Sequence, residues 1–317
     1  MNILITGADG FIGRALVARL LSGVGPDGLS EPHPHLTLLD QRFSATPADP
    51  RLRLVSGDVS DHAVLAEALS DGVDCVFHLA SIPSGAAESS FDLGKRANLE
   101  ATAGLLEQLR RQKTPARVVF ASTIGVYGVP LPQLIDEQTP PQPTMSYGAH
   151  KLIGEILVAD YSRRGFIDGR SLRLPGIVAR PPQASGMLSA FMSDLIRALS
   201  AGRAFTCPVS PDGMAWWMSR SCVVENLLHA AALSSQQAHR RRVYLLPVLH
   251  ASMADVVSAI AKVHGAEVLS RVTYQPNAAL QAQFASLPPL NCPASLEAGF
   301  RHDGTLEALV QRALDGP

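Results

Sequence analysis

The chain contains few cysteines and few aromatic residues, and neither sign of charge is in excess. Its cysteines follow no C-x2-C spacing and have no histidines at zinc-site intervals, so we expect reduced, buried thiols and no metal site. Lys plus Arg number 27 against 28 for Asp plus Glu. This balance argues against a nucleic-acid partner and favours a small-molecule substrate. The cysteines are Cys75, Cys207, Cys222 and Cys292.

Long apolar runs are missing as well. No window approaches the roughly 20 apolar residues that a membrane-spanning helix needs. The first residues, Met1 to Ile5, have the character of a buried strand and leave no room for a secretion signal. We therefore expect a cytoplasmic protein with no membrane partner. With 317 residues, 46% of them hydrophobic, the chain can bury a large core.

The N-terminal half alternates short apolar segments with segments whose apolar residues recur at helical spacing. This alternation is typical of βαβ units and predicts an α/β fold with a Rossmann-type, doubly wound parallel sheet. We expect a surface loop at 24–35 and an irregular connection at 129–144. The expected strands are 2–6, 36–40, 52–56, 74–79, 116–122 and 170–174, and the expected helices are 11–23, 61–70, 92–112 and 147–164.

The pattern loosens after residue 175, where prolines separate helical segments. No second glycine-rich nucleotide loop follows. The sequence therefore predicts a dinucleotide-binding domain at 1–174 and a smaller substrate-binding lobe at 175–317, with some exchange of chain between the two. The helices expected in the second part are 187–201, 221–234, 252–264 and 303–314.

A glycine-rich segment follows the first expected strand and opens the first expected helix. Its glycines permit a tight turn and close backbone approach, and the helix N-terminus offers free N–H groups to a pyrophosphate. The spacing is G-x2-G-x2-G rather than G-x-G-x2-G, so a structural turn with incidental glycines remains the alternative. The predicted cofactor-binding residues here are Gly7, Asp9, Gly10, Phe11, Ile12 and Gly13.

The second expected strand ends at Asp40, followed by Gln41. A carboxylate at this place can accept hydrogen bonds from both adenosine ribose hydroxyls and repels a 2′-phosphate, which favours NAD over NADP. Arg42 is a counter-signal, because a nearby arginine can admit that phosphate. Asn98 joins the cofactor set, although a structural role is the commoner one for such a residue. The ends of the third and fourth strands add Asp58, Val59, Leu79, Ala80 and Ser81.

Tyr147 precedes Lys151 by four residues. On a helix this spacing puts both side chains on one face, where the lysine ammonium lowers the phenol pKa from its usual value of about 10. Such a tyrosine can act as a general base that removes a proton from a substrate hydroxyl while hydride leaves the same carbon. The alternative is a tyrosine packed on its helix with the lysine in water. The upstream glycine-rich turn favours the catalytic interpretation.

In this order and at these intervals, the motifs resemble the extended short-chain dehydrogenase/reductase family over nearly the whole chain. The resemblance implies that Tyr147 is the catalytic base, that Lys151 binds the nicotinamide ribose, and that Thr123 hydrogen-bonds the reacting oxygen. Ser122 could share or take that role, and it is expected near the cofactor together with Pro175. The matching segments are Thr6-Gly7-x2-Gly10-x2-Gly13, Gly57-Asp58, His78-Leu79-Ala80, Ser122-Thr123-x2-Val126-Tyr127-Gly128 and Tyr147-x3-Lys151.

The family holds epimerases, dehydratases, reductases and simple dehydrogenases, so the substrate depends on the C-terminal half. Sugar-nucleotide epimerases carry an Asn-Pro-type turn after the strand that ends here at Leu174, and this chain has Pro175-Gly176 instead. In detail the chain resembles NAD-dependent members that oxidise the C2 hydroxyl of a four-carbon sugar acid such as D-erythronate.

A sugar acid needs a cation for its carboxylate, and a planar guanidinium suits bidentate capture. Arg173, Arg180 and Arg220 are the candidates, with Arg220 first, and a structural ion pair is the alternative for each. Trp217 could wall the substrate pocket, although core or dimer packing explains a tryptophan equally well.

Two other functions remain open on this fold. The first is a UDP-sugar 4-epimerase, whose bound NAD is reduced and reoxidised in each cycle without net NADH. The second is a non-catalytic NAD-sensing regulator, which usually shows a broken Tyr/Lys pair. The helices at 92–112 and 147–164 carry apolar positions beyond one buried stripe. In the family such a pair commonly forms a dimer interface, so we expect a homodimer.

Overall fold

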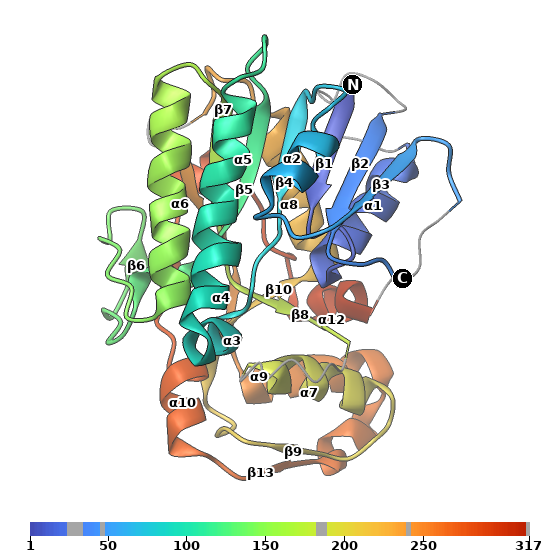
Figure 1. Cartoon of the computed structure of the whole chain (residues 1–317). Helices are drawn as coiled ribbons and strands as arrows, with labels where there is room; N and C mark the ends of the chain where they lie inside the picture. The colour runs from blue at the N-terminus through green and yellow to red at the C-terminus, as the bar shows by residue number, and fades with distance from the viewer. Residues whose placement is uncertain (24–33, 45–47, 182–188, 239–241, 315–317) are drawn as a thin grey trace. The chain divides into compact units, whose positions relative to one another are not determined.

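The computed structural model describes residues 1–23, 34–44, 48–181, 189–238 and 242–314, so most of the loop expected at 24–35 lies outside the described residues. The chain forms two compact units (Figure 1). In the described ranges, no helix is long and apolar enough to cross a membrane. Unit 1 comprises Met1–Val129, Pro140–Arg173 and Val224–Leu245, and unit 2 comprises Pro130–Thr139, Leu174–Val223 and Leu246–Pro317.

Unit 1 is built on a seven-stranded sheet with the order β11-β7-β5-β4-β1-β2-β3. β1 pairs in parallel with β2 and β4, and the pairs β2–β3, β4–β5 and β7–β11 are parallel too. The predicted Rossmann-type sheet is confirmed, and β11 extends it beyond β7. The strands are β1 (Asn2–Thr6), β2 (His35–Asp40), β3 (Leu52–Ser56), β4 (Cys75–His78), β5 (Arg117–Thr123), β7 (Asp168–Leu174) and β11 (Val243–Leu245).

The central strands are apolar because helices cover the sheet. Ile3, Leu4 and Ile5 of β1 are fully buried, and so are Val76 and Phe77 of β4. The order of the strands reverses between β1 and β4, which makes this point the topological switch of a doubly wound sheet. Ligands of such sheets bind in the crevice outside the carboxyl ends of the strands at that switch.

Helices α5 and α6 of unit 1 run side by side (Figure 1). The single helix expected at 92–112 is instead three successive segments, because a π-helical turn, η1, separates α4 from α5. Such turns are rare and often occur at functional sites. The helical segments are α1 (Phe11–Leu21), α2 (His62–Ala68), α3 (Ser84–Ser89), α4 (Phe91–Lys95), η1 (Arg96–Glu100), α5 (Ala101–Leu109), the 3-10 helix η2 (Ile124–Tyr127), α6 (Ser146–Arg163) and the part of α8 (Arg220–Ala232) that follows Val223.

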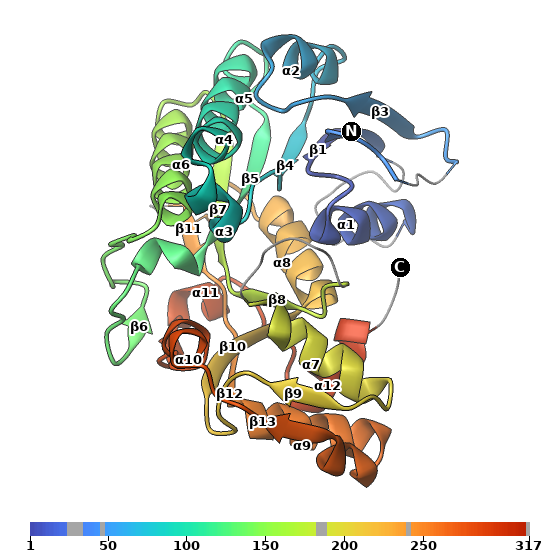
Figure 2. The ribbon, with the colours of Figure 1, turned by 60° about the horizontal axis from the view of Figure 1, so that its bottom comes forward.

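Unit 2 contains small sheets and the remaining helices; its paired strands β9 and β13 lie side by side in Figure 2. The connection expected to be irregular at 129–144 contains the short strand β6. The strands are β6 (Ile135–Asp136), β8 (Gly176–Val178), β9 (Phe205–Cys207), β10 (Met214–Ser219), β12 (Leu249–Ser252), β13 (Val272–Tyr274) and β14 (Leu290–Asn291). The helices are α7 (Ala190–Ser200), α9 (Met253–His264), η3 (Ala266–Arg271), α10 (Ala278–Phe284), α11 (Pro293–Glu297) and α12 (Leu306–Leu314).

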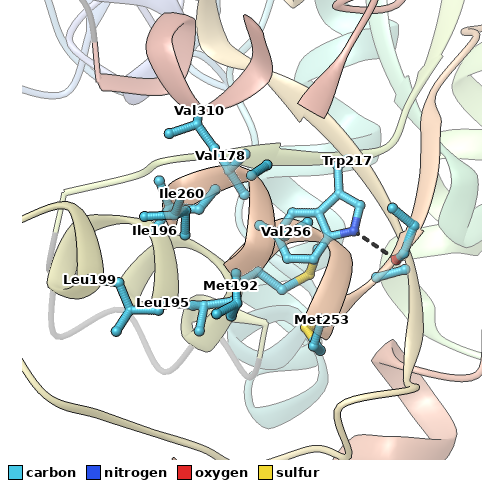
Figure 3. Close-up of a cluster of buried hydrophobic side chains, with 14 of the residues drawn as sticks. Val178, Met192, Leu195, Ile196, Leu199, Trp217, Met253, Val256, Ile260 and Val310 are labelled. Atoms are coloured by element: carbon cyan, nitrogen blue, oxygen red, sulfur yellow. Dashed lines mark hydrogen bonds between the residues drawn. The ribbon is translucent and has the colours of Figure 1, made fainter. Parts of the chain in front are cut away.

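The core of unit 2 is apolar and surrounds Trp217 of β10 (Figure 3). Trp217 is 0% exposed, and its indole N–H donates to the Ala251 carbonyl at 3.1 Å. Met192, Met253 and Val256 belong to the same cluster. The structure therefore contradicts the expectation that Trp217 lines a substrate pocket, because core packing uses its ring and a backbone carbonyl takes its polar atom.

Candidate active site

The turn after β1 packs three glycines closely, and the first of them, Gly7, lies against the residues that follow β4. Gly7 adopts a φ of +71°, and a Cβ on it would lie 2.7 Å from the Ala80 nitrogen. A Cβ on Gly13 would lie 2.2 Å from the Gly7 carbonyl oxygen. Gly10 N donates to that same oxygen at 3.1 Å and is the N-cap of α1. Only residues without a side chain allow the chain to close this far at the switch point, as a phosphate-binding turn requires.

Asp40 is anchored beside this turn at the end of β2. Its Oδ2 accepts a hydrogen bond from Asp9 N at 2.9 Å, and its Oδ1 accepts one from Gln41 N at 2.8 Å. Burial raises the pKa of Asp40, and these two hydrogen bonds oppose that shift. The side chain of Asp9 has a local role, since its Oδ2 pairs with Arg14 at 2.9 Å and accepts from Ser44.

A chain of hydrogen bonds with defined donors and acceptors links β1, β4 and α5. The Thr102 hydroxyl donates to the Asn98 carbonyl at 3.0 Å, so it accepts from Nε2–H of His78, also at 3.0 Å. Nδ1 of His78 is then left to accept from the Thr6 hydroxyl at 2.7 Å. Burial, aided by the charge of Lys151, lowers the pKa of His78 to about 3. The imidazole is therefore neutral.

Asn98 supports the loop after β4 instead of presenting its amide. Its Oδ1 accepts from Ile82 N at 2.8 Å, and its Nδ2 donates to Ile82 O at 3.1 Å. The side chain is fully buried on η1, so the contacts assign Asn98 the structural role. Leu79 and Ala80 are half-buried next to this loop, and Ser81 is exposed.

Asp58 and Val59 follow β3 as expected, and both are half-buried. Asp58 Oδ1 accepts from the backbone and the hydroxyl of Ser60, at 2.9 and 2.7 Å. Burial acts to raise the pKa of Asp58, but these hydrogen bonds and Arg96 outweigh it and lower the pKa. Asp58 is thus an ionised acceptor at the sheet edge.

The segments that carry Thr123 and Tyr147 meet at a close contact between two glycines. A Cβ on Gly148, in the first turn of α6, would lie 2.4 Å from the Gly125 carbonyl oxygen in η2. Gly125 N donates to Thr123 Oγ1 at 3.0 Å and so fixes that oxygen at the end of β5. The hydroxyl hydrogen of Thr123 can then be donated to another oxygen.

Lys151 is buried on the same face of α6 as Tyr147. It is 1% exposed, and its Nζ lies 4.8 Å from the Phe120 ring centroid and 5.9 Å from that of Tyr147. Burial lowers its pKa from 10.5 to about 7. An anion placed near this buried lysine would raise its pKa, because an opposite charge favours the ammonium form.

Ser122 and Arg173 meet at Glu155, a residue that we did not predict. The Ser122 hydroxyl donates to Oε1 of Glu155. Arg173 forms a bidentate pair with both carboxylate oxygens at 3.0 and 2.7 Å, and it donates to the Tyr127 hydroxyl at 2.9 Å. These contacts argue against Arg173 as the substrate cation, because Glu155 and Tyr127 already occupy its guanidinium. They also direct the Ser122 hydroxyl toward α6, which leaves Thr123 as the candidate for the reacting oxygen.

Four predicted site residues lie in unit 2. Pro175 is buried between β7 and β8, and Trp217 belongs to the core. The backbone N–H of Arg180 donates a hydrogen bond to Oγ of Ser193 at 3.0 Å. Arg220 begins α8, and burial, followed by the charge of Arg197, lowers its pKa.

Comparison with known proteins agrees with this geometry. The model of the NAD dependent epimerase/dehydratase family matches residues 3–246. The chain belongs to this family. It is 40% identical to D-erythronate dehydrogenase of Cupriavidus necator, across 99% of this chain and 98% of the relative. It is 31% identical to D-erythronate dehydrogenase of Haemophilus influenzae, across 99% of both chains. These findings make it an NAD-dependent dehydrogenase.

Solved structures of epimerase/dehydratase type share the fold. A nucleoside-diphosphate-sugar epimerase from Agrobacterium tumefaciens is 33% identical, with a TM-score of 0.90 over 98% of this chain and 92% of that one. The holo form of a GalE-like L-threonine dehydrogenase from Cupriavidus necator is 21% identical, with a TM-score of 0.83 over 99% of both chains, and it supports the fold alone.

The residues of unit 1 fit the family's cofactor. The turn at Gly7 and Gly13 leaves the space that a Cβ would fill, and it does so at the switch point where dinucleotides bind. Asp40 supplies carboxylate oxygens at the end of β2, as NAD binding requires. The chain therefore has NAD as its cofactor, as predicted.

Sequence reasoning missed the buried supporting residues Glu155 and Phe120, and it quoted Tyr127 in a motif without giving it a role. One signal for Glu155 was available, because it follows Lys151 by four residues on a predicted helix. A charged residue on the buried face of a helix needs a partner, and Arg173 in an apolar strand needs one too. Matching these two unexplained charges would have predicted the pair.

Proposed function

We propose that the protein oxidises the C2 hydroxyl of a four-carbon sugar acid, D-erythronate or a close relative, to the 2-oxo acid. The observation that carries this proposal is the full-length similarity to two D-erythronate dehydrogenases, combined with the clustering of Thr123, Tyr147 and Lys151 in unit 1. When bound, NAD supplies the acceptor for the hydride.

In the proposed mechanism Tyr147 is the general base. Thr123 would donate its hydroxyl hydrogen to the C2 oxygen, because its own oxygen is fixed by Gly125 N. The phenolate of Tyr147 would remove the hydroxyl proton, and Lys151 would stabilise that phenolate from the same face of α6. Gly7, Gly10, Gly13 and Asp40 would hold the dinucleotide.

Arg220 is the proposed ligand of the substrate carboxylate, with Arg180 second. Arg173 is no longer a candidate because it pairs with Glu155. If Arg220 has this role, Arg220→Ala should raise KM for the sugar acid by at least roughly tenfold, the usual effect of losing a charge-assisted hydrogen bond. The Kd for NAD should not change. Arg180→Ala, measured in parallel, distinguishes the two arginines.

A UDP-sugar 4-epimerase is the second candidate, and one observation favours it: the similar Agrobacterium structure is described as a nucleoside-diphosphate-sugar epimerase. The two reactions differ in redox balance. Oxidation of a sugar acid releases one NADH per turnover, whereas 4-epimerisation returns each hydride to the sugar and releases none.

The deciding experiment incubates the purified protein with NAD and a panel of four-carbon aldonates, with UDP-hexoses in parallel, and follows absorbance at the NADH band. Net NADH with an aldonate is the expected result. If no acid gives NADH and a UDP-hexose is converted to its 4-epimer, the sugar-acid assignment is wrong.

The protein is proposed to act as a homodimer through the expected helix pair, which in the structure is α4, η1 and α5 together with α6. Phe91 of α4 is 57% exposed and Ile156 of α6 is 60% exposed, which is unusual for large apolar side chains. Ile156→Glu should convert a dimer into a monomer in light scattering. Leu269→Glu, at an equally exposed position of unit 2, is the control that should leave the mass unchanged. A monomeric wild-type protein would contradict the proposal.

A further inference from the structure

Lys151 and Glu155 are buried one helical turn apart on α6. Lys151 is 1% exposed and Glu155 is 3% exposed. Residues four apart share a helix face, and helical side chains point back toward the N-terminus, so the Glu155 side chain is directed toward Lys151. An opposite charge at this spacing, in a buried setting, is the natural partner of a lysine ammonium.

The side chains of Lys151 and Glu155 both contact strand β5 of unit 1. The Lys151 ammonium lies over the ring of Phe120, and Glu155 accepts from Ser122, two residues further along β5. Residues two apart on a strand point to the same face and lie roughly 7 Å apart. A change of rotamer would therefore bring the Glu155 carboxylate within reach of the Lys151 ammonium.

Arg173 holds the carboxylate in its present place. It forms two hydrogen bonds to Glu155, at 3.0 and 2.7 Å, from β7. Burial acts to lower the pKa of Arg173, but its hydrogen bonds and charge contact with Glu155 prevail and raise it. The Tyr127 hydroxyl and ring hold the guanidinium in turn, at 2.9 Å and 5.0 Å. All three side chains are buried, so water does not compete for these contacts.

We infer that Arg173 is a positioning residue for Lys151: by occupying the carboxylate of Glu155, it keeps the lysine ammonium available to Tyr147 and to the bound cofactor. Without Arg173, Glu155 would be a buried, unpaired carboxylate one turn from a buried lysine, and the two would pair. The ammonium would then be neutralised where the phenolate needs it. The inference rests on the proposed role of Tyr147, and its cofactor-binding part rests on NAD dependence alone.

The charged and titratable groups around this pair come from several elements. Tyr147 lies on α6 itself, His78 on β4 is neutral, and Tyr127 in η2 contacts Arg173. On the neighbouring helices the charges have other partners: Glu107 of α5 pairs with Arg110, and Glu88 and Lys95 influence His150. Arg173 is accordingly the cation that determines whether Glu155 is available to Lys151.

The test compares Arg173→Met with the double variant E155Q/R173M. Two quantities are measured on folded protein between pH 6 and 10: the Kd for NAD, and the pH at which kcat reaches half its maximum. R173M should weaken NAD binding by roughly tenfold and raise the kcat midpoint by about one pH unit, the equivalent of one partner charge. The double variant no longer has the competing carboxylate. Its Kd for NAD should therefore lie within about threefold of the wild-type value, and its kcat midpoint within about half a pH unit of the wild-type midpoint.

The matched control is Arg170→Met. Arg170 is buried on the same strand, β7, and pairs with Asp168 at 2.9 Å, so its loss also breaks a buried ion pair. It should lower the unfolding temperature without changing the NAD affinity or the pH midpoint. If R173M behaves like R170M, Arg173 is structural only and the inference is overturned; a double variant as impaired as R173M overturns it too.

Arg173→Gln replaces Arg173→Met if the latter does not fold. Glutamine is shorter and uncharged, so it removes the bidentate ion pair with Glu155 while keeping a polar side chain in the buried site, and the same shifts are expected in NAD affinity and pH midpoint. Wild-type values in R173Q would refute the inference. If the wild-type protein oxidises no sugar acid, the proposed function fails, and the NAD-affinity series still decides the role of Arg173.

Discussion

The interiors of the two units differ in chemistry. Unit 1 buries His78, Asn98, Lys151, Glu155 and Arg173, each with specific polar or ring contacts. The largest core cluster of unit 2 is apolar, and even its tryptophan uses its N–H on a backbone carbonyl. Buried polar groups cost free energy unless they are partnered, so a unit that carries many of them devotes its interior to chemistry. Among its described residues, unit 2 buries fewer polar groups, chiefly Ser219 and Asp303, which are hydrogen-bonded to each other.

The largest expected effect comes from removing the proposed general base of unit 1. Tyr147→Phe removes the hydroxyl and should lower kcat by about 10²- to 10⁴-fold, the range for loss of a general base. NAD should bind with unchanged affinity, because the ring and Lys151 remain. Tyr161→Phe on the same helix is the control; it removes only a 3.3 Å bond to Glu107 and should leave kcat intact. Turnover retained by Tyr147→Phe would remove this residue as the base.

The next effect concerns the turn in unit 1. A Cβ at Gly13 would lie 2.2 Å from the Gly7 carbonyl, so Gly13→Ala must displace the turn from α1. Overpacking of this kind costs about 1–3 kcal/mol, and we expect NAD affinity to fall at least roughly tenfold in calorimetry. Gly104→Ala in α5 is the matched variant, because its Cβ meets atoms no nearer than 3.6 Å. Equal NAD binding by the two variants would show that the turn does not hold the cofactor.

In unit 2, a core substitution should lower the free energy of unfolding rather than the activity. Trp217→Ala leaves a large cavity in an apolar core and removes the hydrogen bond to Ala251, so it should cost about 3–5 kcal/mol in urea unfolding. Trp217→Phe keeps most of the volume and should cost less. A Trp217→Ala protein of wild-type stability but altered KM would mean that the tryptophan contacts substrate after all.

The last expected effect is a pH dependence of stability that originates in Lys151. Burial lowers its pKa from 10.5 to about 7, so between these values the unfolded chain binds a proton that the folded chain lacks. The free energy of unfolding therefore rises with pH in this window, by up to about 1.4 kcal/mol per unit from this group. The difference in unfolding free energy between wild type and Lys151→Met, measured in urea from pH 7 to 9, should show that rise. A flat difference would mean that Lys151 keeps an ordinary pKa.

The sequence predicts best what depends on local spacing. The Gly7, Gly10 and Gly13 turn, the Tyr147–Lys151 pair and the parallel sheet follow from residue types at short, fixed intervals. The role of Arg173 does not follow from local spacing, because its partner Glu155 lies on the preceding helix α6; only matching the two charges, each on an otherwise buried face, would have indicated the pair. Trp217 shows the same limit, since burial depends on the strands and helices that pack around it.

His78 has a consequence for how kinetic data on this enzyme are interpreted. Its two ring nitrogens are fixed as one donor and one acceptor by Thr102 and Thr6, so the ring has a single tautomer. With a pKa near 3, it takes up no proton anywhere in the range where enzymes are usually assayed. An inflection near pH 6 to 7 in a rate profile, which is usually attributed to a histidine, must here be assigned to a group other than this one.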